Sequence, residues 1–129
     1  MEKKIIKTDK APLPIGSYNQ GMVVNGLIFT AGQIGIDPST GKLIDGSFKD
    51  RVKQVFDNLE NILIAAGSDL TKVVKFTVFL TNLENYADVN EVFNSRLDEA
   101  IAPARSLVEV SALPAGTDVE IECVAIVNE

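Results

Sequence analysis

The stretch that decides the fold is residues 47–81, which read SFKDRVKQVFDNLENILIAAGSDLTKVVKFTVFLT. Its first part repeats apolar side chains at spacings of three and four, which predicts an amphipathic helix over residues 47–66. Ser47 suits the N-cap of this helix, and Gly67 suits the position just after its last turn. Residues 73–81 are mostly β-branched or aromatic, which is typical of a strand. The apolar stripe of the helix consists of Phe48, Val52, Val55, Phe56, Leu59, Ile62, Leu63 and Ala66.

Upstream of this stretch the sequence predicts three strands. Residues 3–7 suit a first strand, and residues 11–17 form a loop because two prolines and a glycine oppose a helix there. Residues 18–24 and 27–31 are expected to pair as a hairpin, since Asn25 and Gly26 between them tolerate positive φ angles. Residues 32–41 are rich in glycine and turn formers, so we expect a loop that can hold short extended pieces.

Downstream, a second helix is predicted over residues 83–100, and Pro103 stops its continuation. Two final strands are expected over residues 105–110 and 119–127. The order is then β-β-β-α-β-α-β-β, which predicts an α+β fold with a mixed sheet and both helices on one face. We see no repeat and no linker, so residues 1–129 are expected to form a single domain. The stripe of the second helix is Tyr86, Val89, Val92, Phe93 and Leu97.

Alternation along the strands assigns side chains to the two faces of the sheet. In residues 73–81 we expect one face to carry Val74, Phe76, Val78 and Leu80, and the other to carry Val73, Lys75, Thr77, Phe79 and Thr81. The face away from the helices is half polar and half apolar. Two interpretations remain open at this point: burial of this face against another subunit, or an ordinary solvated face. Its members are Lys75, Thr77, Phe79, Glu120, Glu122, Val124 and Ile126.

Composition excludes several classes of function. The 129 residues include 12 basic and 18 acidic side chains, and the net charge of −6 opposes binding to a phosphate backbone. There is no histidine, which removes the usual general base near neutral pH and the commonest metal ligand. The single cysteine, Cys123, excludes an intrachain disulfide. No secretory signal or membrane span is indicated, so a cytoplasmic protein is expected.

Two charged residues stand in apolar surroundings. Arg105 begins an apolar strand, and its guanidinium suits a small carboxylate ligand, although an internal salt bridge to a glutamate is the alternative. Glu120 lies among alternating apolar residues and can position a water molecule, or it can be a solvated side chain or the ion-pair partner of Arg105.

The other candidates give weaker signals. Tyr18 can close a pocket or pack on the core, and Cys123 is interpreted as a small core side chain rather than a reactive thiol. Gly32 and Gly35 fit neither the P-loop nor the dinucleotide fingerprint, and the carboxylates show no spacing typical of a metal site.

Several blocks together resemble the RidA/YjgF family of reactive-intermediate deaminases. The C-terminal block is Pro103-Ala104-Arg105-Ser106-Leu107-Val108-Glu109-Val110, followed by Leu113 and Val119-Glu120-Ile121-Glu122. The opening blocks are Ala11-Pro12, Ile15-Gly16-Ser17-Tyr18-Asn19-Gln20 and Thr30-Ala31-Gly32-Gln33-Ile34, and the middle is Val78-Phe79-Leu80 with Val89-Asn90. The match covers essentially the whole chain in order.

The resemblance implies a chorismate-mutase-like α+β fold with a six-stranded sheet. It also implies a homotrimer with a central sheet barrel and pockets between subunits, which would bury the half-apolar face. The implied activity is hydrolysis of 2-imino acids and their enamine tautomers, such as 2-iminobutyrate and 2-iminopropanoate, to 2-keto acids and ammonia. Such intermediates escape from pyridoxal-phosphate enzymes. The resemblance implies neither a cofactor nor a metal.

The same resemblance assigns roles to residues. Arg105 would bind the substrate carboxylate, and Glu120 would polarise the attacking water. Because a protonated imine is strongly electrophilic, it can react with this water without a histidine as general base. Tyr18, Thr30, Ala31 and Gly32 would line the pocket, with backbone groups near Ala31 in reach of the substrate. Asn90 would support the pocket. Leu107 departs from several members, which carry cysteine there, and leaves the preferred imine side chain open.

Two other functions compete with the deaminase. Some members of the family have been described as translation inhibitors or endoribonucleases, but the negative charge and the absence of histidine give little support to RNA cleavage here. A non-catalytic protein that binds small carboxylates, or a holdase with exposed apolar surface, would use the same residues. Sequence does not separate these from an enzyme.

Overall fold

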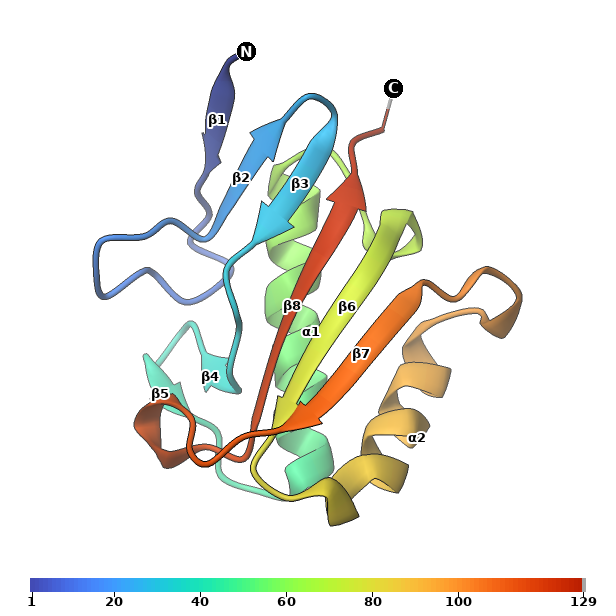
Figure 1. The fold of residues 1–129 in the computed structure, drawn as a ribbon. Helices are drawn as coiled ribbons and strands as arrows, with labels where there is room; N and C mark the ends of the chain where they lie inside the picture. The colour runs from blue at the N-terminus through green and yellow to red at the C-terminus, as the bar shows by residue number, and fades with distance from the viewer. Residues whose placement is uncertain (129) are drawn as a thin grey trace.

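Six strands form one mixed sheet in the order β1-β2-β3-β8-β6-β7 (Figure 1). The structure is a computed structural model and describes residues 1–128. β6 and β7 are parallel, and every other neighbouring pair is antiparallel. The strands are β1 (Lys3–Ile6), β2 (Gly21–Val24), β3 (Leu27–Thr30), β6 (Val73–Leu80), β7 (Ala104–Glu109) and β8 (Val119–Ile126).

Two helices cover one face of this sheet. α1 (Phe48–Ala65) lies behind the central strands, and α2 (Tyr86–Arg96) lies beside it next to β7 (Figure 1). A small hairpin of β4 (Ile36–Asp37) and β5 (Lys42–Leu43) stands at one end of the sheet. The predicted α+β fold with a mixed sheet and both helices on one face is confirmed.

Both helices and the sheet share one hydrophobic core. Its centre is a cluster of three rings, with Phe93 of α2 at 4.8 Å from Phe56 of α1 and 5.1 Å from Phe76 of β6, measured between centroids. Both pairs meet edge to face, an arrangement that favours the aromatic quadrupoles. The cluster places α2 directly beneath the strand pair β6–β7.

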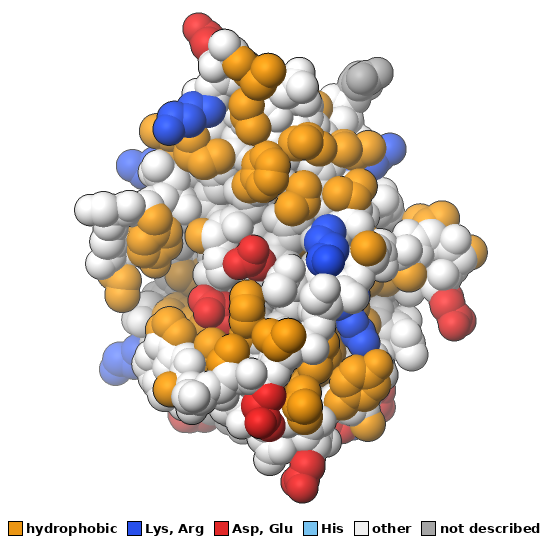
Figure 2. Space-filling view, in the orientation of Figure 1, with side chains coloured by type: hydrophobic (Ala, Val, Ile, Leu, Met, Phe, Trp, Pro, Cys, Tyr) orange, Lys and Arg blue, Asp and Glu red, His pale blue; other side chains and the backbone are white. Residues whose placement is uncertain are grey.

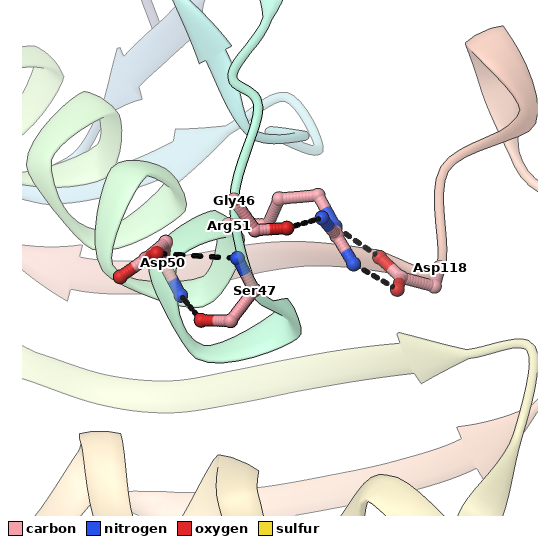
Figure 3. Close-up of polar contacts among 5 residues, drawn as sticks. All are labelled: Gly46, Ser47, Asp50, Arg51 and Asp118. Carbon is pink, nitrogen blue, oxygen red and sulfur yellow. Dashed lines mark hydrogen bonds and ion pairs between the residues drawn. The ribbon is translucent and has the colours of Figure 1, made fainter.

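The predicted start and end of α1 are confirmed. The Ser47 hydroxyl accepts a hydrogen bond from the Asp50 N–H at 3.2 Å, and the Asp50 carboxylate accepts one from the Ser47 N–H at 3.2 Å (Figure 3). This reciprocal capping box satisfies two donors that the first turn leaves unpaired. Gly67 has φ +78°, the left-handed conformation that ends helices.

The predicted hairpin between β2 and β3 is confirmed, but its first strand is shorter than expected. Asn25 and Gly26 both have positive φ, at 50° and 77°, as the tight turn requires. Strand pairing starts at Gly21 rather than at Tyr18. Gln20, just before this strand, is buried, and its side-chain amide donates to the Ala11 and Pro12 carbonyls of the preceding loop.

Two further expectations were wrong in detail. A register shift in the pairing with β8 falls between Val73 and Lys75, so Val73 is buried and Val74 is 44% exposed, the reverse of the alternation predicted. The second helix ends at Arg96, because Leu97 is extended (φ −122°, ψ 141°). Separate 3₁₀ turns at Leu83–Asn85 and Glu99–Ile101 flank it, and Leu97 and Asp98, between the helix and the second turn, are not helical.

The face of the sheet away from the helices is half apolar, as predicted. In Figure 2 hydrophobic side chains gather over one part of this face and acidic side chains lie near its middle. Register places Phe29 opposite Met22 and Val124, and Leu27 opposite Ile126. Phe29 and Ile126 are 42% and 41% exposed. This half-apolar open face is left uncovered by the helices and strands of residues 1–128.

Candidate functional site

A cavity of about 370 Å³ opens beside the start of β8. Tyr18, Gly32 and Glu120 line it together, so the structure brings three of the predicted site residues to one place. Its walls come from the loop before β2, the segment between β3 and β4, and the 3₁₀ turn Pro114–Gly116. The other lining residues are Pro12, Leu13, Ile15, Gln20, Gln33, Ile34, Ile36, Pro38, Gly41 and Pro114.

Glu120 lies close against the backbone at Gly32. A Cβ atom added at Gly32 would lie 2.6 Å from Oε2 of Glu120, so the carboxylate occupies the space that any other residue at position 32 would fill. Burial raises the pKa of Glu120, and the nearby charge of Glu122 raises it further. A carboxylate with a raised pKa is a stronger base than an exposed one, which suits it to accept a proton from water.

Arg105 is held by one side of α2. Its guanidinium donates to Oδ1 of Asn90 at 2.7 Å and to the hydroxyl of Tyr86 at 3.5 Å. The same group stacks over two rings, 4.9 Å from the centroid of Phe93 and 5.6 Å from that of Tyr86. Within residues 1–128 no carboxylate forms an ion pair with this guanidinium, so it remains available to an anion.

Arg105 and Glu120 lie on opposite faces of the sheet. Arg105 is in register with the buried Phe76 and therefore faces the helices, whereas Glu120 is in register with Phe79 on the open face. The internal ion pair between them, one of the alternatives from sequence, is not formed. The structure therefore separates the predicted residues into two groups, one on each face of the sheet.

Thr30, Ala31 and Leu107 do not line the cavity. The Thr30 hydroxyl accepts from the Cys123 N–H at 3.0 Å, and the Ala31 N–H donates to the Gln20 carbonyl at 2.9 Å. Leu107 lies on the same face of β7 as Arg105 and packs against the core. Cys123 is buried, and burial raises the pKa of its thiol to about 12. It therefore behaves as the core side chain expected.

Sequence reasoning missed the aromatic support of Arg105. Tyr86 and Phe93 were assigned only to the apolar stripe of the second helix. Tyr86, Asn90 and Phe93 are spaced by four and three residues, which places them on one side of α2. The signal was therefore present in the spacing, but the parallel pairing that brings β7 over α2 was needed to interpret it.

An ion pair fixes the start of β8 next to the cavity. Arg51 of α1 donates to both carboxylate oxygens of Asp118 at 2.8 and 2.7 Å and to the Gly46 carbonyl at 2.9 Å (Figure 3). The hydrogen bond from Arg51 lowers the pKa of Asp118. Since Asp118 is two residues before Glu120, this pair ties the strand that carries the carboxylate to α1.

Residues 1–128 show neither a metal site nor a membrane span. Within that range no three cysteine or acidic side chains lie close enough together to hold a metal ion. None of the helices in the same range has the length and apolar character needed to cross a bilayer.

These features define a class: a small α+β protein with a carboxylate in a cavity on the open sheet face and an uncompensated arginine at the edge strand. The family model described as endoribonuclease L-PSP matches residues 8–127, so the chain belongs to this family. A RutC family protein from Synechocystis is 48% identical over 127 residues, covering 98% of each chain. The resemblance to the RidA/YjgF family is thereby confirmed.

Relatives with more informative names are also similar over nearly the whole chain. The protein named 2-iminobutanoate/2-iminopropanoate deaminase from Rattus norvegicus is 44% identical, covering 96% of this chain and 90% of the rat protein. A crystal structure of a Rid-family protein from Yersinia pestis matches with a TM-score of 0.95 and 43% identity, covering 98% and 100% of the two chains. E. coli TdcF with bound serine matches with a TM-score of 0.90 and 39% identity, covering 97% and 99%.

Proposed function

We propose that this protein hydrolyses 2-imino acids and their enamine tautomers to 2-keto acids and ammonia. The observation that carries the proposal is the pair of half-sites: an arginine whose charge is unneutralised, and a carboxylate with a raised pKa in a cavity. A guanidinium binds a carboxylate through two parallel hydrogen bonds, and a basic carboxylate activates water. The name of the rat relative supports this assignment.

The reaction uses water as its only co-reactant. With Arg105 binding the substrate carboxylate, a water oxygen bonds to C2 of the protonated imine, and Glu120 takes one proton from that water. The resulting carbinolamine has a C–N bond to break. Glu120 returns the proton to nitrogen, the C–N bond breaks to release ammonia, and the ammonia takes the hydroxyl proton as the C=O bond forms. The products are the 2-keto acid and an ammonium ion.

A substrate that touches both residues requires two copies of the chain. Arg105 lies on β7, the edge strand of the sheet, where a neighbouring subunit can reach it. Glu120 lies on the open face, which carries the exposed apolar residues Phe29 and Ile126. We therefore place the complete site between subunits of a homotrimer, with Arg105 from one subunit and Glu120 from the next.

The remaining candidates take supporting positions in this proposal. Tyr18 and Gly32 accompany Glu120 in the cavity, and Asn90 orients the guanidinium of the opposing half-site. Leu107 lies beside Arg105 and shapes the carboxylate end. Thr30 and Ala31 hold the strand end that leads into Gly32, through their bonds to β8 and to Gln20.

A coupled assay tests the proposal. An amino acid oxidase generates 2-iminobutanoate in situ, and the appearance of the keto acid is followed with wild type and with Arg105→Ala. Wild type is expected to accelerate hydrolysis and Arg105→Ala is not. No acceleration by wild type on several imino acids would overturn the enzymatic assignment and favour a carboxylate-binding protein. Acceleration by both proteins would refute the role given to Arg105.

A further inference from the structure

The N-terminal segment is basic, in contrast to the rest of this acidic chain. Four of the 12 basic residues lie among the first ten, and all four side chains are exposed. Within residues 1–128 none of the four forms an ion pair. Figure 2 shows basic side chains at the side of the molecule where Figure 1 places β1. The four residues are Lys3, Lys4, Lys7 and Lys10.

β1 is an edge strand with one free side. Its residues pair with β2 in antiparallel register, from Lys3 opposite Val24 to Ile6 opposite Gly21. No strand among residues 1–128 pairs with the other side of β1. Backbone N–H and C=O groups on that side are therefore open to a further strand, and this is how extended peptides add to a sheet.

A groove follows β1 on the helix side of the sheet. It has a volume of about 580 Å³ and is lined by β1, the turn between β2 and β3, and the last turn of α1. Lys4 and Lys7 line it with a single carboxylate, that of Glu2. The helix side is not the face that we place between subunits, so the groove stays open in the proposed trimer. Its apolar floor consists of Ile6, Val23, Ala65, Ala66 and Val127.

The side chains of β1 determine which strands can pair with it. In chain order they are Lys3, Lys4, Ile5 and Ile6, and Lys7 follows directly. Opposite charges on neighbouring strands stabilise pairing, whereas like charges destabilise it. A second copy of β1 would bring further lysines and leave every charge uncompensated. A strand with acidic residues opposite the lysines and apolar residues opposite the isoleucines fits both kinds of side chain.

We propose that β1 and this groove bind an extended acidic segment of a partner protein by strand addition. In antiparallel pairing the segment reads acidic, apolar, apolar, acidic, acidic, from the position opposite Lys7 to the position opposite Lys3. The groove shares no lining residue with the cavity beside Glu120, and β1 is the edge opposite to β7, which carries Arg105. Binding here is therefore separate from imine hydrolysis.

A short peptide is the direct probe. Glu-Val-Ile-Glu-Glu, flanked by glycines and labelled with fluorescein, is titrated with the protein, and fluorescence anisotropy follows binding. A second peptide carries lysine in place of each glutamate. We expect the acidic peptide alone to bind, and its affinity to fall as salt is raised. No binding at protein concentrations up to about 1 mM, or equal binding of both peptides, would overturn the proposal.

Matched variants connect binding to the groove. Lys4→Glu reverses a charge in the groove, and Lys53→Glu makes the same change in net charge on an exposed turn near the other end of α1. We expect Lys4→Glu to weaken binding of the acidic peptide about tenfold or more. Lys53→Glu should weaken it less than about twofold, because charges beyond about 8 Å are screened. Equal losses would overturn the proposal. A changed subunit number in Lys4→Glu would assign this edge to another copy of the chain and would also overturn it.

Amide hydrogen exchange tests strand pairing itself. Adding the acidic peptide is expected to slow exchange in residues 3–6 and to leave the opposite edge strand, β7, unchanged. Unchanged exchange in residues 3–6, or slower exchange in β7, would overturn strand addition at β1. A single-stranded oligonucleotide that displaces the peptide with equal affinity would show a general polyanion surface and would overturn the choice of an acidic protein segment.

Discussion

The substitution Gly32→Ala tests how closely the carboxylate must be placed. The new Cβ would lie 2.6 Å from Oε2 and 2.9 Å from Cδ of Glu120, and an ordinary contact starts at 3.4 Å, so the carboxylate must retreat by ~0.8 Å. Misplacement by about 1 Å can cost roughly 100-fold in rate, so we expect kcat/KM for 2-iminobutanoate to fall about 10- to 100-fold. The clash involves the mobile end of a side chain, and stability is expected to change by no more than about 1 kcal/mol.

A double-mutant cycle isolates this effect. Glu120→Asp moves the carboxylate carbon back to the Cγ position, 3.1 Å from the new Cβ, so the closer contacts at 2.6 and 2.9 Å are lost. In the Glu120→Asp background, Gly32→Ala should therefore change kcat/KM by less than about twofold. Wild-type activity of Gly32→Ala, or an equal loss in both backgrounds, would refute the close placement of Glu120 against Gly32.

Three further predictions concern charges around the site. Burial raises the pKa of Glu120, and the negative charge of Glu122 raises it further. Glu122→Gln removes that charge, so the acid limb of the pH–kcat/KM profile should shift to lower pH. An unshifted limb would argue against Glu120 as the base. Arg51→Ala breaks the bidentate bond to Asp118 and should cost roughly 1–2 kcal/mol in urea unfolding. Since this bond lowers the pKa of Asp118, its contribution should vanish as the pH falls through that lowered pKa; a pH-independent cost would contradict the pair. Tyr86→Leu removes one ring under the site arginine and should raise KM about two- to fivefold, whereas Tyr86→Phe should stay near wild type; equal effects would contradict the stacking.

The elements that local sequence determines were predicted closely. The capping residues of α1 and the Asn25-Gly26 turn depend on neighbouring residues alone, and both are confirmed. The errors occur where contacts between residues far apart in the sequence determine the local structure. The bulge at Val74 arises from the pairing of β6 with β8. The loop before β2 extends further than predicted, and the buried amide of Gln20 binds two of its carbonyls.

The candidate site was predicted as residues but not as an arrangement. Arg105 and Glu120 were both predicted as site residues. Their positions on opposite faces depend on the register of β7, which is parallel to β6, and of β8, which is antiparallel to β6, and no spacing in the sequence determines these registers. Asn58 was not singled out either. Its side-chain amide binds the carbonyls of Ile34 and Ile36, and nothing in the neighbouring sequence indicates these partners.

The central claim is that one active site takes Arg105 and Glu120 from different subunits, and complementation tests it most directly. Arg105→Ala and Glu120→Ala are each purified, shown to be inactive, mixed in equal amounts, dissociated and reassembled. In randomly mixed trimers about one quarter of the interfaces join an intact Arg105 to an intact Glu120. We therefore predict recovery of about 25% of wild-type deaminase activity. A reassembled mixture as inactive as either variant alone would contradict the shared site.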